Sequence, residues 1–241
     1  MKDQQKVKKR SFLFLITCLF LTSSLTFKTF KKVNQQNISI FGSELFSIDD
    51  IVANSSLNYS TQLIFVKTRY IEKELKKNLS LENVSVYRQI FPFGLKIQIR
   101  TRTPIAYGER IIKGEKITGF VDEDGFFINE KYSEKENLKK FQSKVFGWEE
   151  NFRSVVSKIL KSQRNNDIEF ISINFSPNGF LTLEEKSLNT ILLGFNSAII
   201  ETQLQIISDM KNQLMGEAIL EKIENIDLTD PNNPKIKVFK P

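Results

Sequence analysis

Side chains that carry out most protein chemistry are scarce in this chain of 241 residues. The sequence contains no histidine, which excludes Ser-His-Asp and Cys-His nucleophilic machinery and most zinc sites. Its single cysteine, Cys18, lies inside an apolar run, so no disulfide can form within one chain. We therefore expect a protein without catalytic residues, without a cofactor and without a metal site.

Two carboxylate pairs and one acidic turn are the remaining candidates for chemistry. Glu149-Glu150 and Glu184-Glu185 are adjacent, and neighbouring carboxylates on a helix or strand point in different directions. The turn Asp122-Glu123-Asp124-Gly125 lacks the spaced ligands of a calcium loop and is typical of a hairpin. An exported cell-wall hydrolase stays open as an alternative that these carboxylates do not favour.

The net charge of +7 bears on the class of partner. The lysines are spread along the chain, and no stretch interleaves Lys or Arg with aromatic residues over a binding face. This distribution predicts solubility and some attraction to anionic lipid, and it predicts no nucleic-acid partner. The sequence has no phosphate loop, no metal-binding cluster and no histidine, so we expect no small-molecule substrate.

The first structural element predicted along the chain is an apolar helix. Residues 1–10 carry five Lys or Arg, and residues 11–27 carry no charge. Those seventeen residues span about 26 Å as a helix, and a snorkelling Lys28 would extend the span to residue 30. We predict a cytoplasmic tail at 1–10 and a type II transmembrane helix at 11–30, with the rest of the chain outside. A cleaved signal peptide and a lipoprotein at Cys18 remain alternatives.

An α+β module is predicted at residues 34–108. Its expected elements are a strand at 38–43, helices at 47–56 and 60–78, and two alternating strands that meet at the turn Pro92-Phe93-Gly94. Ser47 is the predicted N-cap of the first helix. Pro104 cannot donate to a strand ladder, so we expect the last strand to end there or to become an edge.

A mixed, β-rich second domain is predicted at residues 109–241. Its expected elements are a hairpin around Asp124-Gly125, a helix at 149–163, a hairpin at Pro177-Asn178-Gly179, a strand at 190–195, a helix at 198–215 and the short closing strands "ENIDLTD" and "KIKVF". The fold class is therefore α+β, with one anchor and two extracytoplasmic modules.

The motifs of the first module resemble a known family. They are Ile38-x-Ile40-x-Gly42, Ile48-x-x-x-Val52, Arg88…Pro92-x-x-Leu95-x-Ile97-x-Ile99…Arg102-x-Pro104-x-Ala106 and, further on, "GFVDEDGFFI". This part of the chain looks like the extracytoplasmic region of the FtsQ/DivIB bacterial cell-division proteins, whose first module is a POTRA domain. One departure is Thr101, where the family commonly has an acidic residue.

The resemblance implies a function without catalysis. A member would be a divisome scaffold in the bacterial inner (plasma) membrane, at the septum, linking division proteins to septal peptidoglycan synthesis. Its partners would be small bitopic division proteins and septal peptidoglycan synthases. A POTRA-type chaperone for polypeptide transport or outer-membrane assembly is the alternative, although such proteins usually carry several POTRA repeats and this chain has one such unit.

Two sets of residues are predicted to matter for contacts. In the closing strand, Lys235, Lys237 and Phe239 would face outward and bind a partner strand, while Ile236 and Val238 would face the core. The alternative is that the alternating lysines only protect this edge from self-association. Arg102 and Pro104 are predicted to end the first module and to have structural roles at the module junction.

Overall fold

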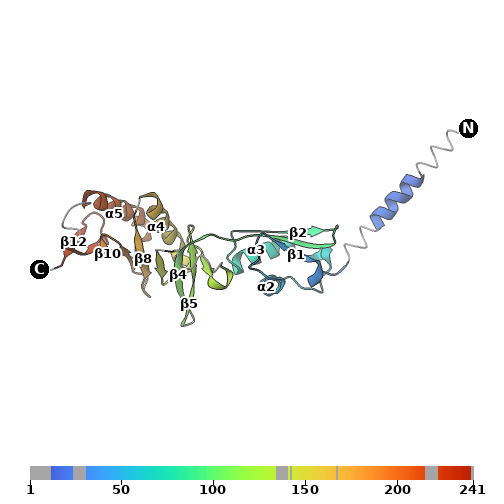
Figure 1. Cartoon of the computed structure of the whole chain (residues 1–241), viewed down its shortest axis with the longest axis horizontal. Coiled ribbons are helices and arrows are strands. Elements are labelled where there is room, and N and C mark those ends of the chain that lie inside the picture. The colour runs from blue at the N-terminus through green and yellow to red at the C-terminus, as the bar shows by residue number, and fades with distance from the viewer. Residues whose placement is uncertain are drawn as a thin grey trace, which may run out of the picture. The chain divides into compact units, whose positions relative to one another are not determined.

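The computed structural model describes residues 12–23, 31–133, 141, 143–166, 168–214 and 222–239. The chain divides into two compact units, unit 1 (Met1–Thr101) and unit 2 (Arg102–Pro241). Figure 1 labels the main helices and strands of each unit. The division falls before residue 108, where the sequence places the end of the first module.

Residues 12–23 form a helix at the start of unit 1. Within the described ranges, no helix is both long enough and apolar enough to cross a membrane. The predicted transmembrane segment at 11–30 is only partly covered, because residues 11 and 24–30 lie outside the described residues, as does the predicted tail at 1–10.

Unit 1 has the predicted β-α-α-β-β order and contains a three-stranded sheet. Strand β1 pairs with β3 in parallel and β2 pairs with β3 antiparallel, which gives the order β1-β3-β2. Helix α3 packs beside β2 and buries Ile71 and Leu75. The elements are η1 (Gln35–Asn37), β1 (Ile38–Phe41), α2 (Ile48–Ala53), η2 (Leu63–Phe65), α3 (Thr68–Asn78), β2 (Asn83–Gln89) and β3 (Gly94–Arg100).

Hydrogen bonds explain where α2 and α3 begin. Ser47 caps α2 as predicted: its hydroxyl accepts from the Asp50 N–H, and the Asp50 carboxylate accepts from the Ser47 N–H, both at 3.1 Å. The helix predicted from residue 60 instead starts at Thr68. The Leu63 N–H donates to the Lys31 carbonyl at 3.0 Å, so this backbone is held in a separate turn, η2.

The predicted turn at Pro92-Phe93-Gly94 connects β2 to β3, and Gly94 is the first residue of β3. Strand β3 ends at Arg100, and Pro104 is the first residue of β4 (Pro104–Ile112) in unit 2, so the proline opens a strand and does not end one. Its missing N–H is tolerated at a first strand position. Because β4 joins the sheet of unit 2, the units divide at Thr101.

Unit 2 is a mixed sheet of nine described strands. Their order is β12-β11-β10-β9-β8-β7-β4-β5-β6, with parallel pairing at β4–β7, β7–β8 and β10–β11. The further elements are β5 (Glu115–Asp122), β6 (Phe127–Asn129), η3 (Glu130–Tyr132), β7 (Lys144–Phe146), η5 (Glu150–Phe152), α4 (Arg153–Asn165), β8 (Phe170–Phe175), β9 (Leu181–Glu185), β10 (Asn189–Gly194), η6 (Ser197–Ile199), α5 (Ile200–Leu214), β11 (Ile223–Asp227) and β12 (Lys235–Val238).

Helices α4 and α5 lie next to each other over the β8–β10 region of this sheet (Figure 1). Ile159 of α4 and Ile207 of α5 are fully buried with Ile173, Leu183 and Ile191 of the strands, in one apolar core. The alternating strand patterns and the helical spacing predicted from the sequence therefore meet in one α+β unit.

Candidate functional site: the module junction and the β12 edge

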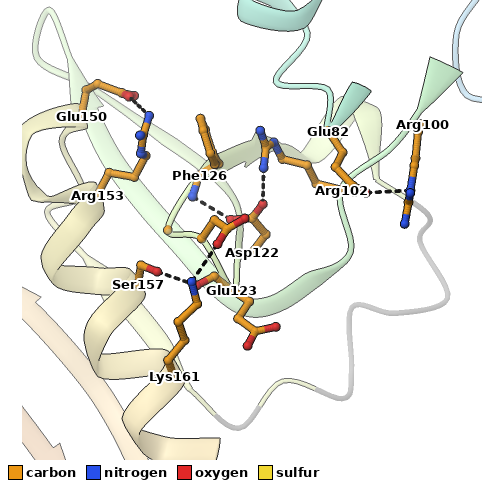
Figure 2. Close-up of polar contacts among 12 residues, drawn as sticks. Glu82, Arg100, Arg102, Asp122, Glu123, Phe126, Glu150, Arg153, Ser157 and Lys161 are labelled. Carbon is orange, nitrogen blue, oxygen red and sulfur yellow. Dashed lines mark hydrogen bonds and ion pairs between the residues drawn. The ribbon is translucent and has the colours of Figure 1, made fainter. Parts of the chain in front are cut away.

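A buried ion pair joins the start of unit 2 to its β5–β6 turn (Figure 2). Arg102 Nη1 lies 2.6 Å from Asp122 Oδ2, and the two side chains are only 6% and 8% exposed. The other carboxylate oxygen of Asp122 accepts the Phe126 N–H at 2.8 Å. One carboxylate thus holds both Arg102 and the turn that follows β5.

Phe126 is stacked by two arginines. The guanidinium carbon of Arg102 lies 3.4 Å from the ring centroid, and that of Arg153 lies 4.1 Å from it. Arg153 also pairs with Glu150 at 2.9 Å. Stacking on an aromatic ring accommodates a guanidinium that has little access to water.

Helix α4 is tied to the same turn. The Ser157 hydroxyl donates to the Glu123 carbonyl at 2.9 Å, and Lys161 Nζ donates to Asp124 Oδ1 at 2.8 Å. The hydrogen bond from Lys161 lowers the pKa of Asp124 below its usual range. Arg164 lies 3.2 Å from Glu123.

All three acidic residues of this turn are therefore paired with cations of the protein. In the part of the chain that the structure describes, no cluster of His, Cys, Asp or Glu is placed to hold a metal ion. Arg102 and Pro104 stand at the start of unit 2, and Pro104 is in register with Asp122. This arrangement fixes the start of unit 2 to its own β5–β6 turn.

Sequence reasoning singled out Arg102 but missed its partner. Asp122 was visible only as part of an acidic turn, and its burial separates it from the exposed Asp124. By contrast, Arg100 in unit 1 pairs with Glu82 at 3.0 Å while 75% of its side chain is exposed (Figure 2). Two arginines in one short motif thus have opposite environments.

The second candidate site is β12, the last strand of the sheet order. It pairs with β11 on one side, and no described strand pairs with its other side. Ile236 is in register with the fully buried Ile226, so it lies on the core face as predicted. Ile236 and Val238 are nevertheless 44% and 43% exposed, because an edge strand has a neighbour on one side only.

Hydrogen-bond alternation sets which N–H groups of β12 are open. The Phe239 N–H donates to the Lys222 carbonyl at 2.8 Å, towards β11. Directions alternate along a strand, so the N–H of Lys237 also points to β11, whereas those of Ile236 and Val238 point to the open edge. A proline at Lys237 would therefore disturb β11–β12 pairing and not the free edge.

The predicted outward residues lie in a partly neutralised environment. Lys237 Nζ is 2.7 Å from Glu224 Oε1. Lys235 is in register with Asp227, whose pKa is lowered mainly by hydrogen bonds from Thr229 and further by Lys235. Phe239 is 55% exposed. The edge thus offers backbone donors and apolar side chains more than free positive charge.

Comparison with known proteins identifies the first module. Residues 33–102 match the family described as "POTRA domain, FtsQ-type", and this range ends at the division between the units. The chain is also similar to the cell division protein DivIB of Bacillus cytotoxicus, with 27% identity over 112 residues. That alignment covers 44% of this chain and 44% of the relative, so less than half of the relative's length is matched. The resemblance to FtsQ/DivIB proteins is confirmed.

Proposed function

Starting from a chain with an FtsQ-type POTRA domain, we propose a membrane-anchored, non-enzymatic scaffold of the bacterial divisome. It links division proteins and septal peptidoglycan synthesis through extracytoplasmic protein contacts, at the septum of the inner (plasma) membrane. The observation that carries this proposal is the match at residues 33–102, together with the similarity to a cell division protein.

The helix at residues 12–23 supports an anchor in this proposal. Its large side chains are exposed on all sides, and a helix that is apolar all round belongs in a core or a bilayer. The most exposed of these side chains are Phe12, Leu13, Phe14, Leu15, Leu19, Phe20 and Leu21. Residues 11–30 are thus proposed to span the membrane, with residues 1–10 in the cytoplasm.

The β12 edge is the proposed partner site. A partner strand would pair with the outward N–H groups of Ile236 and Val238, and the exposed ring of Phe239 would anchor it. Lys235 precedes Ile236, and Lys237 lies between Ile236 and Val238; both lysines would disfavour a basic partner strand. Small bitopic division proteins and septal peptidoglycan synthases are the proposed partners.

The environments of the carboxylates give no support to a hydrolase. Glu185 is buried and accepts the backbone N–H groups of Ser187 at 2.6 Å and Leu188 at 2.8 Å. Glu184 accepts the Ser172 hydroxyl, and Glu150 pairs with Arg153. These contacts are structural. For the transport alternative, the described part of unit 2 is a larger mixed sheet and not a second POTRA repeat.

Depletion of the protein tests the cellular role. Cells should elongate or enlarge without dividing, and a fluorescent fusion should gather at midcell. Full depletion with normal septation would remove the division role and favour the transport alternative.

A further inference from the structure

Three segments of unit 1 meet at one end of its sheet. The Val33 N–H donates to the Thr61 carbonyl at 2.9 Å, and Leu63 donates to Lys31 at 3.0 Å. The start of the folded region, residues 31–33, is therefore fastened to the loop that leads into η2. Any restraint on residue 31 acts directly on this loop.

The β2–β3 turn lies at the same end. Arg88, at the end of β2, donates from Nη2 to the Val66 carbonyl at 2.8 Å, directly after η2. Gly94, at the start of β3, is so close to the Asn37 carbonyl that an added Cβ would lie 1.9 Å from its oxygen. Residues 31–37, η2 and residues 90–93 thus share one end of unit 1.

Large apolar side chains are exposed at the loop tips of this end. Phe65 in η2 is 65% exposed and Phe91 in the β2–β3 turn is 71% exposed, and each is preceded by an exposed isoleucine, Ile64 or Ile90. Tips of turns offer no free strand edge, so backbone pairing with a partner strand does not explain them. Exposed Phe and Ile at loop tips favour insertion into an apolar phase.

The charged side chains in the segments that form these tips have one sign, while Glu72, one turn beyond Arg69 in α3, accepts the Val86 N–H of β2 at 2.7 Å. Lys31, Lys32, Lys67 and Arg69 are all exposed. The segments that form this end, residues 31–37, 58–70 and 88–94, contain no Asp or Glu. We call Ile64, Phe65, Ile90 and Phe91, with these four cations, the loop-tip patch.

We propose that the loop-tip patch binds the surface of an anionic lipid bilayer. The phenylalanines and isoleucines enter the headgroup region, while the lysines and the arginine contact lipid phosphates, which are the groups that complement this charge. The location fits, because residue 31 closely follows the proposed membrane span; that step rests on the proposed function. The charge and the exposed side chains stand independently of it.

This contact would orient unit 1. Strand β3 runs seven residues from the turn at Gly94 to Arg100, which is roughly 20 Å. With the turn on the bilayer, Thr101 leaves unit 1 at the opposite end, away from the lipid. The POTRA domain would then stand on the membrane and not move freely on a tether.

Quenching by brominated lipids tests the contact. Phe65→Trp and Phe91→Trp are made in the full chain, with Phe41→Trp as the control: it is exposed on β1 and pairs with Gln98, four residues along β3 from the turn at Gly94. The natural Trp148 is buried in unit 2 and gives the same background in each chain. The chains are reconstituted into phosphatidylcholine vesicles with and without phosphatidylglycerol.

We expect the emission of the Phe65→Trp and Phe91→Trp chains to shift to the blue and to be quenched strongly in anionic vesicles, with little change for Phe41→Trp. Lys67→Glu with Arg69→Glu should remove most of this quenching. Lys76→Glu with Lys77→Glu, an equal charge change at exposed positions at the end of α3, should not.

The outcomes separate this proposal from the anchor. The patch contact is overturned if the two loop positions are quenched no more than Phe41→Trp. If the same chain resists alkaline extraction, the anchor remains supported. A protein partner would then be the occupant of the patch. Salt-sensitive quenching in a chain that alkali extracts supports the patch contact and contradicts the anchor.

Discussion

At the scale of single residues, Arg102 and Asp122 place opposite charges where water hardly reaches. Removing one partner of a buried pair is costly, because the remaining charge stays buried without compensation. The Phe126 ring and its backbone N–H complete the environment of the pair. These contacts hold the start of unit 2 to the β5–β6 turn, and removal of either charge should destabilise this part of unit 2.

Asp122→Asn and Asp124→Asn compare the same change in two environments of one turn. We expect Asp122→Asn to lower the free energy of unfolding of unit 2 by about 3–5 kcal/mol, since Arg102 loses its buried counter-charge. Asp124 pairs with Lys161 at the surface, so Asp124→Asn should cost no more than about 1 kcal/mol. Urea unfolding followed by Trp148 fluorescence reports unit 2. Equal, small shifts for the two variants would show that the Arg102–Asp122 pair does not hold the start of unit 2 to the β5–β6 turn.

At the scale of elements, local patterns predicted hairpins and helices well. The β2–β3 and β8–β9 hairpins follow from alternation and turn residues, which are properties of adjacent positions. The start of α3 could not be predicted, because the bond from Leu63 to Lys31 joins segments far apart in sequence. Pro104 opens β4, which the sequence analysis missed, although β4 and β5 form a hairpin across Lys113-Gly114, two adjacent residues at positive φ that give a local turn signal.

In the candidate sites too, features set by neighbouring residues were predictable and features set by long-range contacts were not. The closing strand at Lys235 was predicted from its alternation, and its place at the sheet edge agrees with the expectation for a last strand. The exposure of Ile236 and Val238 depends on how many neighbours cover the edge, so alternation predicts their face but not their burial. The Arg102–Asp122 pair is a tertiary contact, and no pattern in the sequence indicates that these two residues pair.

The open N–H groups of β12 allow a sharp test of partner binding. Val238→Pro removes a donor that points to the free edge, while Val238→Ala shortens the side chain and keeps the donor. We expect both variants to fold, and only Val238→Pro to lose capture of division partners in a pull-down from crosslinked dividing cells. The proline should leave the Phe239–Lys222 bond in place.

Equal loss in Val238→Ala and Val238→Pro would mean that the side chain, and not the backbone, binds the partner. Full capture by Val238→Pro would place the partner elsewhere. Charge reversal at Lys237 is a less clean test, since it also breaks the pair with Glu224 inside the protein.

At the scale of the whole molecule, the two proposed contacts belong to different units. The bilayer contact uses loop tips of unit 1, and the partner strand uses the edge of unit 2. The two contacts share no residue, so loss of one should leave the other measurable. A scaffold built in this way needs one firm attachment to the membrane, which is the proposed span at residues 11–30.

The apolar run is short for a span, and its polar residues decide whether it inserts. The Thr22 hydroxyl donates to the Cys18 carbonyl at 2.9 Å, so this polar group is satisfied within the helix and costs less in hydrocarbon. Thr22-Ser23-Ser24 is a poor cleavage site, and we expect the mature protein to keep its N-terminus. The intact mass of the protein purified from membranes measures whether the N-terminus is kept. Leu19→Arg tests insertion: a charge at the centre of the span costs about 2.5–3.5 kcal/mol of insertion free energy, so this variant should lose resistance to alkaline extraction. A mature chain that begins after Ser24 would contradict the anchor and identify the run as a signal peptide.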